Sequence, residues 1–161
     1  QVATVIRASG SNVVDKVQQL VDDNRRLQKE IEGLKSKLAN ASGSDLMSGL
    51  REIAGINVLS TVVEGADAKS LRDVADQVRS KIDKGAFLLV AVDGDRAALL
   101  VGVTNNLTDR IKAGDLLKHV AAQVGGKGGG RPDMAQGAAT DISALPEALE
   151  SVFSWVETNL S

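Results

Sequence analysis

The sequence predicts a protein of mixed α and β structure (α/β, with α+β character). We expect a long N-terminal helix with a coiled-coil-like pattern, followed by a small globular domain in which helices flank a mixed β-sheet. Apolar residues recur with alternating spacings of four and three over residues 13–38, which predicts the long helix. From residue 56 onward, β-branched runs of strand length alternate with helical patterns, which predicts the globular domain.

The long helix is predicted over residues 11–40, with Ser11 and Asn12 offering an N-cap. Residues 1–10 before it are expected to be the tail of a preceding domain. The a and d positions of the heptads after Val13 are Val17, Leu20, Asn24, Leu27, Ile31, Leu34 and Leu38. β-branched residues at a with leucine at d favour two parallel strands, and a single Asn at a fixes their register. This seam predicts a homodimer; packing inside the same chain or on an upstream domain is the alternative.

A linker is predicted over residues 41–54, because NASGSD at residues 40–45 is rich in small and polar residues. One or two helical turns are expected within it, between Leu46 and Ile53. The globular domain is then expected over residues 55–161.

The globular domain begins with a predicted strand–helix–strand unit, made of residues 56–63, 68–82 and 86–92. A single helix between two strands favours a parallel pair joined by a right-handed crossover. Asp93-Gly94-Asp95 predicts a tight turn into a third strand over residues 96–104. The second and third strands should therefore form an antiparallel hairpin, which makes the sheet mixed.

Two more helices are predicted in the C-terminal third of the chain. The first begins at Ala113-Gly114-Asp115 and continues through Val124. The second follows Leu145-Pro146, because proline suits the first turn of a helix.

Between these two helices, residues 125–137 read GGKGGGRPDMAQG and are predicted to form an ordered loop. Simple flexible linkers lack polar residues such as its Asp133 and Gln136. Glycine tolerates positive φ, so successive N–H groups could converge into a nest for an anion, with charge added by Lys127 and Arg131. The segment fits neither a P-loop, which needs Gly-Lys-Ser/Thr, nor a dinucleotide fingerprint, which follows a strand.

Charge and composition restrict the possible functions. The net charge is −2, yet residues 107–131 carry five basic and two acidic side chains, which is a weak pointer to phosphate binding. The chain has no cysteine and a single histidine, His119, which excludes disulfides, Cys-based zinc sites and paired catalytic histidines. Two phenylalanines and one tryptophan are too few for a base-stacking platform. We therefore expect neither catalysis nor a metal site.

The segments together resemble the C-terminal region of bacterial alanyl-tRNA synthetases, which contains the DHH-associated C-Ala domain. The resemblance centres on GGKGGGRPDMAQ at residues 125–136 and extends to SNVVDKVQQLVDDNRRLQKEIEGLKSKL, VTNNLTDRIKAGDLL and DISALPEALESVFSWV. It covers nearly the whole chain from Ser11 onward. It implies that residues 1–10 end the editing domain, and the chain, which starts at Gln1 rather than at Met, is expected to be a fragment.

The resemblance implies that the globular domain binds the elbow of tRNA and that the C-terminal region contributes to dimerisation. The parent enzyme would use ATP to attach alanine to tRNA-Ala and would edit Ser- and Gly-tRNA-Ala. The sites for ATP, magnesium and zinc would lie in the upstream aminoacylation and editing domains, so this fragment is expected to hold no cofactor and to catalyse no reaction. The expected location is the cytoplasm.

The family motif also implies which residues contact tRNA. Those that match it are Gly125, Gly126, Lys127, Gly128, Gly129, Gly130, Arg131, Asp133 and Gln136. Three more cations would extend the same surface: Lys118, Lys112 and Arg110. Folded RNA is recognised through phosphates, shape and 2′-hydroxyls, which suits such a surface.

Two other functions are alternatives. The chain could be the substrate-binding half of a DHH-type phosphoesterase, whose relatives use a Gly-Gly-Gly-His pattern. Arg131 stands where that histidine would be, and the chain has no DHH motif, which counts against this function. The chain could also be a purely structural module, in which the helix dimerises and the globular domain caps it.

Overall fold

The computed structural model describes residues 13–41 and 46–161, with side chains described for 13–34 and 46–161. The chain divides into two compact units, Gln1–Leu34 and Lys35–Ser161. The tail predicted at residues 1–10 lies outside the described residues.

The long helix α2 spans Val13–Ala41, in agreement with the helix predicted over residues 11–40. Its described apolar seam is exposed: Leu20 is 46%, Leu27 52% and Leu34 54% accessible. The side chain of Leu38, the last predicted seam residue, lies outside the described residues. Residues 13–34 of α2 therefore present an apolar stripe that their own unit leaves uncovered.

The second unit is built on a six-stranded mixed sheet with the strand order β1-β2-β3-β4-β6-β5. The strands are β1 (Arg51–Ile53), β2 (Ile56–Val62), β3 (Gly85–Asp93), β4 (Arg96–Val103), β5 (Lys127–Gly130) and β6 (Met134–Ala139). β2 and β3 are parallel, and every other neighbouring pair is antiparallel. The predicted mixed sheet, with its parallel pair and its β3–β4 hairpin, is thus confirmed.

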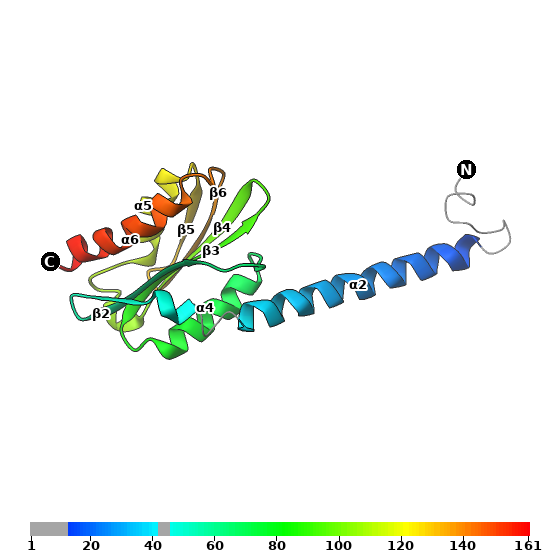
Figure 1. The fold of residues 1–161 in the computed structure, drawn as a ribbon, viewed down its shortest axis with the longest axis horizontal. Coiled ribbons are helices and arrows are strands. Elements are labelled where there is room, and N and C mark those ends of the chain that lie inside the picture. The colour runs from blue at the N-terminus through cyan, green and yellow to red at the C-terminus, as the bar shows by residue number, and fades with distance from the viewer. Residues whose placement is uncertain (1–12, 42–45) are drawn as a thin grey trace. The chain divides into compact units, whose positions relative to one another are not determined.

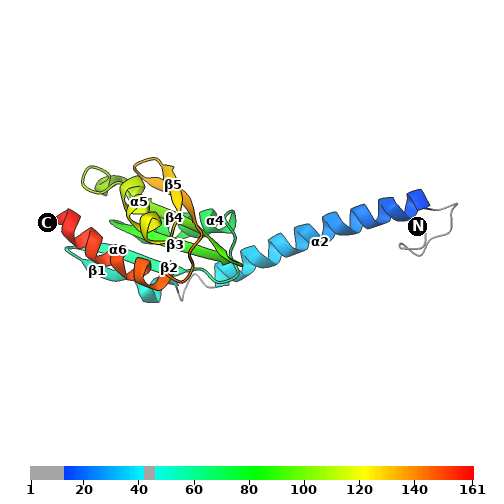
Figure 2. The ribbon, with the colours of Figure 1, turned by 90° about the horizontal axis from the view of Figure 1, so that it is seen from above.

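Helices cover both faces of this sheet (Figure 1). Helix α4 (Ser70–Lys81) lies on one face, and α5 (Ala113–Gln123) and α6 (Leu145–Leu160) lie on the other. Figure 2 shows α5 and α6 lying over the strands. The described part of this unit also contains two short 3-10 turns, η2 (Met47–Gly49) and η3 (Asn105–Leu107).

The sheet separates two hydrophobic cores. Side chains alternate between its faces along each strand, so Leu99 and Val101 of β4 pack toward α5 and α6, whereas Leu100 packs toward α4. Helix α4 contacts β3 and β4 but makes few contacts with the edge strands β6 and β5. The α4 side of those two strands is therefore open.

The predicted linker over residues 41–54 is wrong from residue 46 onward. Leu46 is buried in the core on the α4 side, and β1 pairs with β2 at the edge of the sheet. The helical turns expected between Leu46 and Ile53 are limited to η2. Residues 42–45 lie outside the described residues. A strand of three residues is too short to show an alternating pattern, so β1 leaves no recognisable signal in the sequence.

Candidate functional site

The glycine-rich segment forms an edge hairpin, so the loop predicted over residues 125–137 is wrong. Strand β5 pairs antiparallel with β6, from Lys127 opposite Ala138 to Gly130 opposite Ala135. Within this described segment only Gly125 has a positive φ, of 60°. The predicted nest of converging N–H groups is therefore absent there; β5 instead offers the free edge of a sheet, with its unpaired N–H and C=O groups.

Most glycines of the hairpin are required by close backbone packing. A Cβ built on any of four of them would come within 2.2–2.7 Å of a backbone oxygen of the partner strand: Gly126, Gly128, Gly130 and Gly137. Gly128 would also clash with Leu117 of α5. These glycines let the edge strand lie directly against β6 and α5.

Lys127 lies on the α4 side of the hairpin. Paired residues share a face of a sheet, as do residues two apart in one strand. Gly128 faces Leu117 of α5, so Lys127 and Gly129 on either side of it face the opposite way. Gly129 pairs with Gln136, which places Gln136 on the α4 side as well.

Helix α4 supplies two arginines that the sequence analysis missed. Arg72 donates a hydrogen bond from Nη2 to Oε1 of Gln136 at 2.7 Å. Arg79 Nη1 lies 3.6 Å from Oδ2 of Asp133. The two arginines are seven residues apart and therefore share one side of the helix. The seven-residue spacing can be recognised in the sequence. That the two arginines contact the hairpin becomes clear only from the fold, which places the hairpin beside α4.

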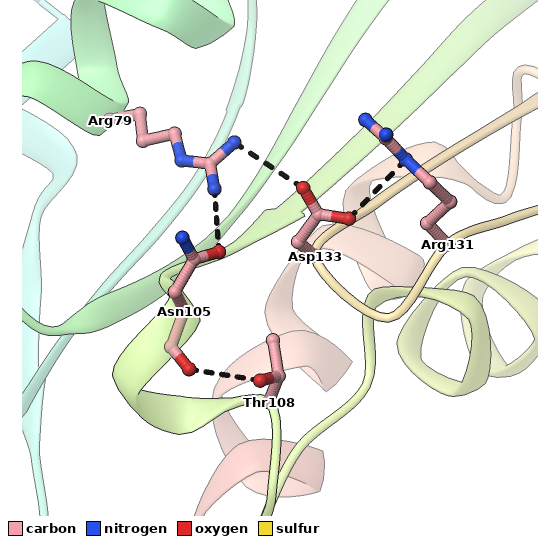
Figure 3. Close-up of polar contacts among 5 residues, drawn as sticks. All are labelled: Arg79, Asn105, Thr108, Arg131 and Asp133. Carbon is pink, nitrogen blue, oxygen red and sulfur yellow. Dashed lines mark hydrogen bonds and ion pairs between the residues drawn. The ribbon is translucent and has the colours of Figure 1, made fainter.

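Asp133 links α4 to the turn of the hairpin (Figure 3). Its carboxylate contacts Arg79 and also lies 3.5 Å from Nε of Arg131. The Asp133 side chain is 23% exposed, whereas that of Arg131 is 78% exposed. Arg79 is held further by a 2.8 Å hydrogen bond to Oδ1 of Asn105. Figure 3 shows the Nη atoms of Arg131 pointing away from Asp133, where they are available to another acceptor.

A hollow of about 370 Å³ lies between α4 and the hairpin. Its lining combines three charged residues with two glycines, one methionine and one glutamine: Arg72, Asp76, Gly129, Gly130, Arg131, Met134 and Gln136. Two guanidinium groups against one carboxylate make the lining net positive. Guanidinium groups bind phosphate and carboxylate oxygens through directed pairs of hydrogen bonds, so this hollow suits an anion.

Lys112, another predicted contact, lies beside the turn of the hairpin. It immediately precedes α5, whose first residue, Ala113, donates its N–H to the carbonyl of Pro132 at 2.8 Å. The structure therefore brings Lys112 close in the fold to Arg131, which the sequence separates by nearly twenty positions.

The last two predicted cations belong to the α5–α6 side of the sheet. Arg110 donates from Nη2 to the carbonyl of Leu160, at the end of α6, at 2.9 Å. Lys118 lies on α5, where its Nζ is 3.8 Å from Oδ1 of Asp115. Neither residue joins the hollow, so the predicted basic surface is divided between the two faces.

Another polar cluster of the globular unit surrounds the chain's single histidine. His119 Nε2 lies 3.2 Å from Oγ of Ser151, and its ring centroid is 6.1 Å from that of Trp155. Within residues 13–41 and 46–161, no three His, Cys, Asp or Glu side chains are grouped so as to hold a metal ion. None of the helices in those ranges has the length and apolar character needed to cross a membrane.

Comparison with known proteins gives matches along the whole chain. A family model described as the DHHA1 domain matches residues 55–158. Alanine–tRNA ligase from Saccharophagus degradans is 49% identical over 155 residues, which are 96% of this chain and 18% of that protein. Alanine–tRNA ligase from Halorhodospira halophila is 47% identical over 161 residues, again 18% of its length. The chain thus spans about one fifth of the length of these relatives.

Solved structures share the fold. The C-Ala domain of alanyl-tRNA synthetase from Aquifex aeolicus matches with a TM-score of 0.63 and 25% identity, over 67% of this chain and 97% of that domain. A chain described as a DHH domain of a member of the s1p family of ribosomal proteins matches with a TM-score of 0.50 and 17% identity. That second match covers 92% of this chain and 35% of the other, and it shows a shared fold alone.

Proposed function

Because this chain belongs to the DHHA1 domain family and matches the C-terminal region of alanine–tRNA ligases, we propose that it binds tRNA through the α4 side of the β5–β6 hairpin. The resemblance found in the sequence is confirmed by these matches. The proposed contact on tRNA is the elbow. The proposed parent activity is the ATP-dependent attachment of alanine to tRNA-Ala with editing, carried by upstream domains, while this chain binds without catalysis.

The observation that carries the proposal is the meeting of basic side chains from two distant segments on one open face. Arg72 of α4 and Arg131 of the hairpin line the same hollow, and Lys127 lies on the same side of β5. Between the two arginines the hollow is lined by Gly129 and Gly130, and Ala138 lies opposite Lys127 on the same side of the hairpin. Proteins recognise folded RNA through its phosphates, its shape and its 2′-hydroxyls, and a shallow floor flanked by guanidinium groups suits that mode.

A mobility-shift assay with whole transcribed tRNA tests the proposal. The double variant Lys127→Ala, Arg131→Ala should bind at least about tenfold more weakly, because charge-assisted hydrogen bonds to phosphate are lost. A control variant, Lys81→Ala with Lys84→Ala, removes the same charge at two exposed positions outside the proposed contact and should bind nearly as the unaltered chain does. Unchanged affinity in the first variant would remove the hairpin from the mechanism.

A second role, dimerisation through α2, is supported by the exposed seam of that helix. Leu20, Leu27 and Leu34 occupy successive d positions and are each about half exposed. A second copy of the helix would cover this stripe, with Asn24 paired across the seam. The proposed partners are therefore tRNA, a second copy of the chain and the upstream domains of the parent enzyme.

The phosphoesterase alternative rests on fold alone. The matching DHH-domain structure is 17% identical to this chain. An identity this low shows a shared fold and does not indicate a shared activity. The purely structural alternative leaves the charged hollow without a role. The exposed seam of α2 supports the dimerisation that the structural alternative shares with the proposed function, and no feature of the described residues favours either alternative over that function.

A further inference from the structure

Gly129 has no packing reason to be glycine. A Cβ built there meets nothing within 4 Å, whereas the glycines on both sides of it are held against backbone. Glycine weakens a strand relative to alanine, because it loses more conformational freedom on folding. Gly129 lines the hollow beside α4. Its missing side chain therefore keeps the floor of the hollow open.

The walls of the hollow offer a defined set of donors and acceptors. Gln136 accepts from Arg72 through Oε1, which leaves its Nε2 amide group as a donor. Arg131 stands at the hairpin turn with its Nη atoms directed away from Asp133. Asp76 lies one helical turn after Arg72 and also lines the hollow. An ionised carboxylate only accepts hydrogen bonds, so Asp76 favours a ligand that carries a hydroxyl.

We propose that this hollow binds one ribose–phosphate unit of tRNA. The phosphate oxygens lie against Arg72 and Arg131, the ribose 2′-hydroxyl donates to Asp76, and the sugar passes over the bare backbone of Gly129. The 2′-hydroxyl is the group by which a protein distinguishes RNA from DNA. This inference rests on the proposed function. It adds that α4, together with the hairpin, recognises the sugar and phosphate of the bound tRNA.

The first experiment fills the hollow. Gly129→Leu in the 161-residue chain should leave the midpoint of thermal unfolding unchanged or higher, because a Cβ there meets nothing within 4 Å and the hollow has room for the rest of the side chain. It should weaken binding of transcribed tRNA at least about tenfold, as expected when a charge-assisted contact is blocked. The matched control, Ala122→Leu, adds a similar side chain at an exposed position of α5 and should leave binding unchanged.

The second experiment locates the contact on the RNA. tRNA pools with scattered phosphorothioates or 2′-deoxy nucleotides are separated into bound and free fractions, and each position is read for interference. For the unaltered chain we expect one nucleotide at which both substitutions interfere. Arg72→Gln should remove the phosphorothioate interference at that nucleotide, and Asp76→Ala, which removes the acceptor, should remove the 2′-deoxy interference.

The outcomes separate this subsite from the proposed function. If the unaltered chain retains no tRNA at low salt, the proposed function fails and the subsite fails with it. If the unaltered chain binds but Gly129→Leu binds equally well, the subsite alone is overturned. Interference that persists unchanged in both Arg72→Gln and Asp76→Ala also overturns it, and loss of each interference in its own variant supports it.

Discussion

At the scale of single residues, the surroundings of each glycine decide whether it can be replaced. A Cβ on Gly102 of β4 would lie 2.1 Å from Cζ of Phe87, a ring that is fully buried in the core on the α4 side. A Cβ on Gly129 meets open space. The two glycines lie in the same sheet. Comparing the same substitution at both positions therefore measures how packing changes the free energy of unfolding.

We expect Gly102→Ala to lower the free energy of unfolding by about 1–3 kcal/mol, the usual cost of overpacking a core. Gly129→Ala should leave that free energy unchanged or raise it by up to about 1 kcal/mol, since alanine restricts the unfolded chain. Urea unfolding followed by circular dichroism measures both. Equal effects at the two positions would show that the packing around Gly102 is looser than described.

Asp141 has a perturbed pKa with a clear cause. The hydroxyl of Ser143 donates to its carboxylate, and the backbone N–H of Ser143 donates to the same oxygen at 3.1 Å. The hydroxyl, helped by the backbone N–H groups of Ser143 and Ala144, lowers the pKa of Asp141 below its ordinary value. These contacts order the short connection between β6 and α6.

We expect Ser143→Ala to raise the pKa of Asp141 toward its ordinary value, because the charged form loses its strongest donor. The lowered pKa means that this contact stabilises the fold above the carboxyl's unfolded-state pKa. The stabilisation is lost as the pH falls through the folded-state value. Carboxyl-carbon NMR titration checks this, with Ser154→Ala as the control; an unchanged pKa in Ser143→Ala would exclude the hydroxyl as the cause.

The residues of the site were partly visible in the sequence. Lys127, Arg131 and Gln136 were predicted because they lie in the glycine-rich segment 125–137 and match a family motif. Arg72 and Asp76 were missed, because only the fold brings α4 beside the hairpin. A charged residue on a helix looks like ordinary surface until its neighbours from distant segments are known.

At the scale of elements, β5 shows why a strand can be hidden from sequence analysis. Three of its four residues are glycine, so it has no alternation of apolar and polar side chains, and glycine is depleted in strands. Tertiary packing makes it a strand: it pairs with β6 along its length, and Leu117 of α5 packs on Gly128. Gly128 and Gly130 therefore serve the close approach of backbones rather than the anion nest that was predicted.

Helix α2 gives the prediction at this scale. Leu27→Asp places a charge in the centre of the apolar seam, so a dimer held by that seam should dissociate to monomers. Sedimentation equilibrium should show the mass falling from two chains to one. Gln19→Asp, at an outward c position that is exposed, adds the same charge and should leave the mass unchanged. An unchanged mass in Leu27→Asp would show that the seam is not the interface.

At the scale of the whole molecule, the central part of the sheet was predictable and its edges were not. Strands β2, β3 and β4 are rich in buried apolar residues and follow recognisable turn and helix signals, which gave the parallel pair and the hairpin. The position of β6 and β5 beside β4 depends on contacts between distant segments. The open face beside α4 follows from that strand order and could not be read from local patterns.

The salt dependence of tRNA binding reports how many phosphates this face engages. Each phosphate contact that is lost should reduce the slope of log affinity against log salt concentration by about 0.7–0.9. We therefore expect Lys127→Ala to have a shallower slope than the unaltered chain, whereas Lys84→Ala should keep the original slope. Parallel slopes for all three proteins would indicate that Lys127 does not contact phosphate.

The most direct measurement is chemical-shift mapping of the backbone amides of the 161-residue chain as tRNA is added at low salt. Binding through the face proposed here should shift or broaden the signals of β5, β6 and the hollow-lining residues of α4, while those of α6 on the opposite face stay in place. Perturbations confined to α5 and α6, or spread evenly over the domain, would contradict it.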